Sequence, residues 1–96
     1  MPDLIIVAQV LAKPGAAKEL VAAQTGFVNV ARQQPGCLLY ELFEDESQPG
    51  KVLFFERWKD RQSWDDHRQG AHMEVFRAAT GHLIERIEIL QMRQLA

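Results

Sequence analysis

Apolar residues recur along this chain with two alternating periods, and each change of period marks a new element. Residues 4–12 are rich in Val, Ile and Leu on both alternating faces, which predicts a central β-strand that ends at Lys13-Pro14-Gly15. Residues 16–34 instead carry apolar side chains at helical spacing, and Pro35-Gly36 ends this predicted helix. Its inward stripe consists of Leu20, Ala23, Gln24, Phe27, Val28 and Ala31. Gly26 weakens the helix, and we expect it to let the helix lie close to the sheet.

The second half of the chain begins with a predicted hairpin and ends with a strand. The predicted elements are strands at residues 37–44, 51–58 and 84–93 and helical pieces at residues 60–68 and 71–79. The segment 45–50 is dense in turn residues, so the two strands beside it should pair antiparallel. Leu38, Tyr40 and Leu42 alternate onto one face of the first of them. Asp60 suits a helix N-cap, and Gly70 separates the two helical pieces.

The order β-α-β-β-α-β predicts one α+β domain over residues 1–96 with the ferredoxin-like arrangement. Its four-stranded antiparallel sheet carries the helices on one face only. The predicted strands are apolar on both faces, so the bare face would be a larger apolar patch than a monomer normally exposes. Packing two such faces together removes the patch, and we therefore expect a homodimer that forms a dimeric α+β barrel.

Composition narrows the classes of function. The chain has 96 residues, a net charge of −2 and mixed charge signs throughout, which gives no basic footprint for nucleic acid or for an anionic membrane. The single cysteine cannot form an internal disulfide, which favours a reducing compartment. The start, Met1-Pro2-Asp3, lacks a basic signal-peptide region, and the apolar run 4–8 is too short to cross a membrane. We therefore expect a cytoplasmic protein.

Several common catalytic motifs are missing from the sequence. The six glycines are isolated from one another, so neither a dinucleotide-binding nor a P-loop phosphate cradle is present. No serine lies in a GxSxG elbow, and one cysteine cannot make a CxxC pair. Nucleophilic and thiol redox mechanisms consequently have little support.

Candidate chemistry gathers in residues 58–76. Trp64 and His67 are three residues apart and share a helix face, and His72 follows the break at Gly70, where it could turn back toward the same cleft. Histidine titrates near neutral pH and can take a proton from a phenol. Aromatic neighbours would stack on a flat substrate and exclude water. The pattern indicates a small-molecule pocket with one or two histidines, without naming a reaction.

Each of these residues also has a structural interpretation. Histidines at helix ends are commonly solvated, and tryptophans are commonly core or interface residues. His67 and His72 are five residues apart rather than four and lack a third ligand, so we expect no metal. Glu56 lies within an apolar strand and is either a buried base with a raised pKa or an ion-pair partner. Of these two, the ion pair is the favoured interpretation.

The order and spacing of motifs over nearly the whole chain resemble the antibiotic biosynthesis monooxygenase family. The residues that carry the resemblance are the run 34–42, then Asp45 and Pro49, the run Phe54-Phe55-Glu56-Arg57-Trp58, and finally His67, His72 and Phe76. The resemblance implies a dimeric ferredoxin-like barrel. Well-studied members oxidise quinols or anthrones with O2 and use no flavin, haem or metal, which implies a small aromatic substrate and no cofactor. The haem-degrading branch fits poorly, because its strand asparagine has no counterpart in residues 4–9.

The resemblance also implies roles for particular residues. His67 or His72 would act as the catalytic base, and the electron-rich anion would pass an electron directly to oxygen. The substrate-binding residues would be Trp64, Phe76 and Phe27, which shape the pocket, and Tyr40 and Glu56, which orient the substrate. Two alternatives stay open: an isomerase that uses the same histidines and binds phosphate through arginines, and a non-catalytic dimer that holds a metabolite.

Overall fold

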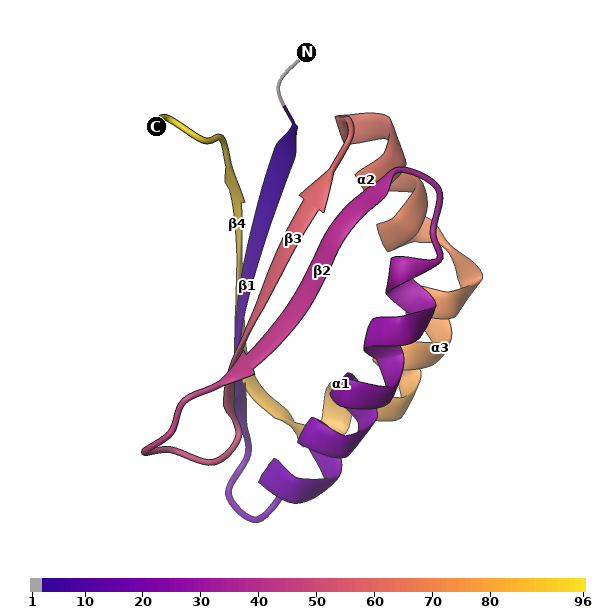
Figure 1. Cartoon of the computed structure of the whole chain (residues 1–96). Coiled ribbons are helices and arrows are strands. Elements are labelled where there is room, and N and C mark those ends of the chain that lie inside the picture. The colour runs from indigo at the N-terminus through magenta and orange to yellow at the C-terminus, as the bar shows by residue number, and fades with distance from the viewer. Residues whose placement is uncertain (1–2) are drawn as a thin grey trace.

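The computed structural model describes residues 3–96 of the chain, and it places every predicted element close to its expected bounds (Figure 1). The elements are β1 (Leu4–Ala12), α1 (Ala17–Arg32), β2 (Cys37–Glu44), β3 (Lys51–Trp58), α2 (Arg61–Gln69), α3 (Ala71–Thr80), a 3-10 turn (Gly81–Leu83) and β4 (Ile84–Met92). The helix predicted over 16–34 is shorter at both ends. The prediction about a signal peptide used Met1 and Pro2, and these two residues lie outside the described part of the chain.

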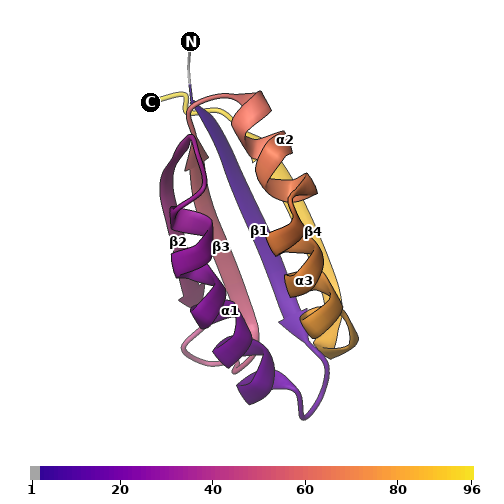
Figure 2. The same ribbon diagram turned by 90° about the vertical axis from the view of Figure 1, so that its right-hand side faces the viewer.

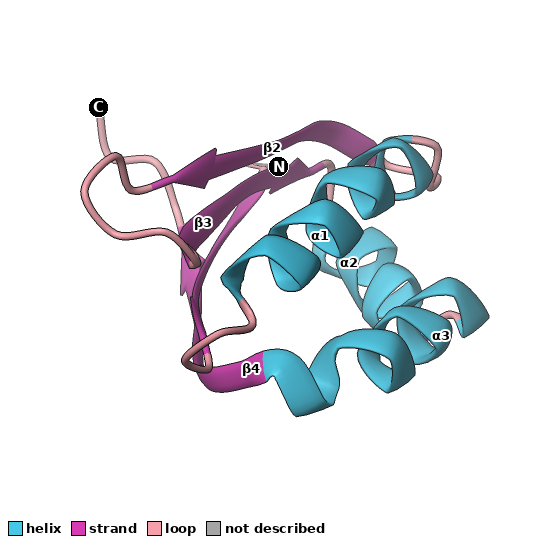
Figure 3. Ribbon diagram, turned by 90° about the horizontal axis from the view of Figure 1, so that it is seen from below, coloured by secondary structure: helices cyan, strands magenta, loops and turns pink. Residues whose placement is uncertain are grey.

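The four strands form one antiparallel sheet in the order β2-β3-β1-β4. All the helices lie on the same face of this sheet, with α1 beside α3 (Figures 1 and 3). Seen from the helical side, α1 lies over β2 and β3, whereas α2 and α3 lie over β1 and β4 (Figure 2). This arrangement confirms the predicted ferredoxin-like α+β fold.

The core lies between the sheet and α1. Leu20, Phe27 and Ala31 from the predicted helical stripe pack there against Ile6 and Trp58 of the sheet, and Trp58 is completely buried. Burial of large apolar side chains such as these is the main favourable term in folding. Gly26, by contrast, lies on the exposed side of α1, and a methyl group added there would meet no atom within 4 Å. The expectation that Gly26 brings the helix close to the sheet is therefore wrong.

The hairpin between β2 and β3 contains an irregularity that moves one predicted side chain. Cys37 pairs with Trp58 and Leu39 pairs with Arg57, so Leu38 is an extra residue in a bulge. Leu38 is consequently 53% exposed and does not share the buried environment of Tyr40. Beyond the bulge the register is regular and sets Tyr40 directly opposite Glu56.

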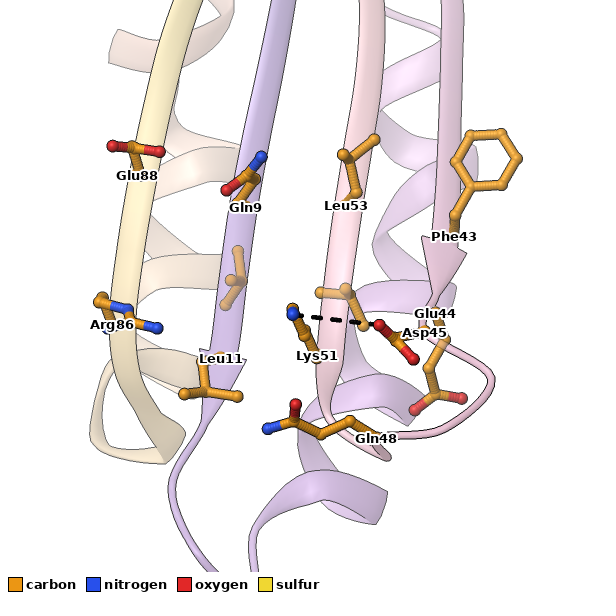
Figure 4. A pocket seen from close by; sticks show the side chains of 12 residues that line it. Gln9, Leu11, Phe43, Glu44, Asp45, Gln48, Lys51, Leu53, Arg86 and Glu88 are labelled. Carbon is orange, nitrogen blue, oxygen red and sulfur yellow. Dashed lines mark ion pairs between the residues drawn. The ribbon is translucent and has the colours of Figure 1, made fainter.

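The face of the sheet that carries no helix is mainly apolar. The register places Val7, Leu53, Phe55 and Leu90 on this face. It is hollowed at the hairpin end, where a cavity of about 670 Å³ is bordered by Arg86, Glu88 and the Lys51–Asp45 ion pair at 4.0 Å (Figure 4). A bare apolar face is the feature from which we predicted a homodimer, and dimerisation remains a prediction. No helix within residues 3–96 is long and apolar enough to cross a membrane.

Candidate active site

A cavity of about 700 Å³ lies between the sheet and the helices, within the size range of small-molecule sites. Five of the predicted site residues line it: Tyr40, Glu56, Trp64, His67 and Phe76. They come from β2, β3, α2 and α3, so the fold brings together residues that are far apart in sequence. Two predicted residues, Phe27 and His72, are not part of the lining. Their rings lie 6.1 Å (Phe27) and 4.9 Å (His72) from the His67 ring, measured between ring centres.

The two predicted histidines form a hydrogen-bonded pair. Asp60 caps α2 by accepting a hydrogen bond from the Ser63 backbone N–H, and α2 then ends at an extended residue, Gly70. This break starts α3 in a new direction and brings His72 Nε2 to 2.9 Å from His67 Nδ1. A side chain at Gly70 would prevent the approach, because an added Cβ would lie 2.6 Å from His72 Cε1. The spacing of five residues therefore suits a proton-sharing pair across a helix break.

Aromatic rings surround His67 on several sides. Its ring lies 4.7 Å from the Trp58 ring, 5.9 Å from that of Tyr40 and 6.1 Å from that of Phe27, measured between ring centres. Burial lowers the pKa of His67 to about 4, with smaller contributions from the charges of His72 and Arg77. His67 is therefore a neutral imidazole at pH 7. Because its Nδ1 faces His72, its Nε2 is the nitrogen left to meet a ligand.

Glu56 is a buried carboxyl group beside this pair. Burial raises its pKa to about 7, opposed by a hydrogen bond of 2.9 Å that Trp58 Nε1 donates to Oε1. Within residues 3–96 Glu56 makes no ion pair. The favoured interpretation of Glu56 as an ion-pair partner is therefore wrong. The burial and the raised pKa agree with the alternative, and the role of Glu56 as a base stays a prediction.

Tyr40 lies opposite Glu56 on the neighbouring strand. Burial, and secondarily the charge of Glu56, raises the pKa of Tyr40 above its ordinary value, so its hydroxyl stays protonated and can donate a hydrogen bond. The carboxyl group of Glu56 thus titrates near neutral pH, whereas the hydroxyl group of Tyr40 does not.

Several lining residues were not selected from the sequence. Gln24 lies in the predicted stripe of α1, where its polar amide could have been recognised as unusual, and it is 1% exposed. Ile87 and Ile89 alternate onto the inner face of β4 and are 52% and 53% exposed, since the cavity separates them from the helices. Arg68 and Arg77 add positive charge to the lining.

Arg77 has no carboxylate partner among residues 3–96, and it donates from Nη1 to the Arg68 carbonyl oxygen at 3.1 Å. Arg68 stacks over Trp64, with its guanidinium carbon 4.8 Å from the ring centre. The described part of the chain holds no cluster of three or more His, Cys, Asp and Glu side chains suited to a metal ion. The polar groups present can bind hydroxyls, accept a proton and stabilise an anion.

These features define a class: a small ferredoxin-like α+β domain with an aromatic-lined cavity between its sheet and its helices. The model of the family described as antibiotic biosynthesis monooxygenase matches residues 3–79. Since this match covers most of the chain, the chain belongs to the antibiotic biosynthesis monooxygenase family, which confirms the resemblance seen in the sequence.

Individual relatives agree with this assignment. The chain is 31% identical to "Putative monooxygenase Rv0793" of Mycobacterium tuberculosis over 84% of this chain and 79% of that protein. It is also 32% identical to the uncharacterized protein sll1783 of Synechocystis over 76% of this chain, and the matched part spans half of that protein's length. The crystal structure of PA3566 from Pseudomonas aeruginosa superposes with a TM-score of 0.94 at 27% identity and covers 100% of this chain and 97% of that one.

Proposed function

We propose that this protein is a monooxygenase that oxidises a flat hydroxylated aromatic, such as a quinol or an anthrone, with the substrate itself supplying the electrons to O2. The observation that carries the proposal is the neutral His67, held by His72 at one side of an apolar cavity large enough for two or three fused rings. Membership of a family named for monooxygenases, and a relative with that name, support it.

The proton step begins at His67. Its Nε2 accepts the phenolic proton, and the Nδ1 proton can then move to His72 Nε2 across the 2.9 Å contact. His72 is only half-buried, so the positive charge ends nearer to water than it began. The relay moves the charge from the more buried imidazole to the less buried one, although burial and the charge of Arg77 also lower the pKa of His72. The charge of Arg77, which has no carboxylate partner within residues 3–96, lies in the lining and stabilises the substrate anion.

The redox step balances without another reductant. An anthrone reacts as its enol tautomer, so the proton that His67 takes is the enol O–H proton that came from the CH2 carbon. The resulting anion gives one electron to O2, and the radical pair combines at this carbon to a hydroperoxide, which takes the proton back from the histidine pair. Loss of water from this hydroperoxide gives the ketone, so one oxygen atom enters the product and the other leaves as water with the two hydrogens of that carbon. A simple hydroquinone can instead transfer two electrons and two protons to O2, which gives quinone and hydrogen peroxide without insertion of oxygen, so this substrate tests the electron transfer to O2 and the anthrone tests the monooxygenation.

The test is oxygen uptake by metal-stripped protein with menadiol and with 1,8-dihydroxyanthrone, corrected for autoxidation. His67→Asn should remove enzyme-dependent uptake, and His72→Ala should reduce it. His82→Ala is the matched control, because His82 is exposed on the 3-10 turn and away from the lining. Uptake at the blank rate with both substrates would reject the oxygenase. Full activity of His67→Asn would remove the histidine from the mechanism.

A second candidate is an isomerase acting on a small phosphorylated molecule. Arg68 and Arg77 in the lining are the observation that favours it, since an isomerase of this kind needs a phosphate site. Oxygen uptake separates the two candidates, because isomerisation consumes no oxygen.

A further inference from the structure

Glu56 lies in the middle of the sheet, where a carboxyl group is unusual. Its strand β3 is flanked by β2 and β1, and the register sets Glu56 between Tyr40 and Ile6, which are both buried. The only hydrogen bond of its side chain within residues 3–96 is the one that Oε1 accepts from Trp58 Nε1 at 2.9 Å. This indole N–H needs one acceptor oxygen, so the bond leaves Oε2 without a structural role.

Oε2 of Glu56 is open to the cavity between the sheet and the helices. Among those of residues 3–96 that are not exposed, Gln24 Oε1 is the only side-chain polar atom that is both fully enclosed and without a hydrogen-bond partner. Glu56 Oε2 accepts no hydrogen bond either, and it is therefore not fully enclosed. Since Glu56 is 5% exposed and lines the cavity, Oε2 is reached from the cavity.

Two neighbours place Glu56 at the His67 end of the cavity. Trp58 donates its hydrogen bond to Glu56, and its ring lies 4.7 Å from the His67 ring between ring centres. Tyr40, which is opposite Glu56 in the register, has its ring 5.9 Å from that of His67. Burial raises the pKa of Glu56 to about 7, so a large share of the protein has a protonated carboxyl group at neutral pH. The proton lies on Oε2, because Oε1 accepts the indole N–H.

From this geometry we infer that Glu56 is a catalytic residue for the loss of water from a hydroperoxide on a benzylic carbon, with which it exchanges protons through Oε2. The carboxyl proton moves to the outer peroxide oxygen, the O–O bond breaks, and its electron pair leaves with that oxygen as water. The electron pair of the C–H bond forms the second bond of the ketone, and the proton from this carbon restores the carboxyl group. The carbon is oxidised and the peroxide is reduced, so no other reactant is consumed. The inference rests on the proposed function only for the source of the hydroperoxide.

The test supplies the hydroperoxide directly and without oxygen, so that the oxygenase reaction is not needed. Tetralin-1-yl hydroperoxide is incubated anaerobically at pH 6 with protein stripped of metals that could decompose it, and the formation of 1-tetralone is followed by chromatography. Wild type should form the ketone faster than the buffer blank. Glu56→Gln keeps an acceptor for Trp58 and should form the ketone about 100-fold more slowly than wild type. Glu74→Gln is the matched control and should keep the wild-type rate, because Glu74 is exposed on α3 and outside the cavity lining.

A second measurement needs no variant. Deuterium on the peroxide carbon should slow ketone formation by wild type severalfold, because the C–H bond breaks in this step. A wild-type rate at the level of the blank, an unchanged rate in Glu56→Gln, or equal rates with hydrogen and deuterium would each overturn the inference. Ketone formation from the hydroperoxide by a protein that takes up no oxygen with menadiol or the anthrone would support the inference and reject the oxygenase alone.

Discussion

Two buried groups in the cavity should give this protein opposing dependences of stability on pH. Glu56 is 5% exposed and His67 is 4% exposed. In each of them burial disfavours the charged form, but the charged form of the carboxyl group exists at high pH and that of the imidazole at low pH. We predict that the two effects nearly cancel in wild type and that replacing either residue reveals the other.

The Glu56 contribution falls as pH rises. Its pKa is raised from 4.5 to about 7, so the folded protein holds a proton that the unfolded chain releases. Its stabilising contribution is complete below pH 4.5 and is lost as pH rises to about 7. This rise in pKa corresponds to at most about 3 kcal/mol, with a slope near pH 5.5 of about 1.2 kcal/mol per pH unit.

The His67 contribution has the opposite sign. Its pKa is lowered from 6.5 to about 4, so here the unfolded chain holds the proton and the folded protein does not. Its contribution is complete above pH 6.5 and is lost as pH falls toward 4, again by at most about 3 kcal/mol. The lowered pKa of half-buried His72 acts in the same direction. Near pH 5.5 the slopes from Glu56 and His67 are about equal and opposite.

The assay is urea unfolding followed by tryptophan fluorescence at several pH values from 4.5 to 7.5, at a fixed protein concentration. Glu56→Gln retains an acceptor for Trp58 Nε1, and its stability should increase with pH by about 3 kcal/mol at most. At pH 7.5 it should exceed wild type, with a Tm higher by about 4–8 °C for each kcal/mol gained. His67→Asn should lose stability as pH rises. If both variants keep the pH profile of wild type, the cavity does not desolvate these groups and the reasoning is refuted.

Three further predictions concern the backbone and the open face of the sheet. Gly70→Ala should displace the His72 ring and lower turnover, measured by oxygen uptake, while circular dichroism shows that the protein stays folded. Unchanged turnover would contradict the proton relay from His67 to His72. Gly26→Ala should stabilise α1 by about 1 kcal/mol, measured by urea unfolding, because the added methyl group meets no atom and Ala is the better helix former. Phe55→Lys places a charge on the helix-free face and should yield a monomer in sedimentation. The control is Val75→Lys on α3, where the side chain is already 69% exposed, and it should leave the oligomeric state unchanged.

The sequence predicted the elements well where local patterns determine them. The strand at residues 4–12 and the hairpin around residues 45–50 depend on alternation and turn residues, and both lie where expected. The bulge at Leu38 was not predictable, because two-residue alternation continues through Cys37–Glu44 without a visible interruption. A bulge depends on how two strands pair, which no single strand specifies.

For the candidate site, the sequence identified residues better than it identified their environments. Five of the predicted residues line the cavity. His72 was expected to turn back toward the same cleft; it contacts His67 but does not line the cavity. The state of Glu56 was misjudged because the absence of a nearby cation cannot be seen in a strand pattern. Gln24 was placed on the inward stripe, but its lack of a hydrogen-bond partner depends on the shape of the cavity.

The cavity exists because α3 packs on α1 and not on the strand beneath it. Phe76 stacks on Phe27 at 4.1 Å, whereas Ile87 and Ile89 of β4 remain about half exposed below α3. This leaves apolar surface exposed in the cavity. A flat ring that covers it would gain about 25 cal/mol of binding free energy for each Å² buried. Affinity should therefore increase with the ring area of the ligand, whereas its hydroxyl groups should act only through the few polar side chains of the lining. Ring area and hydroxyl pattern can be varied separately in a series of ligands. Such a series would measure how much of the binding free energy comes from the apolar walls of the cavity and how much from its few polar groups.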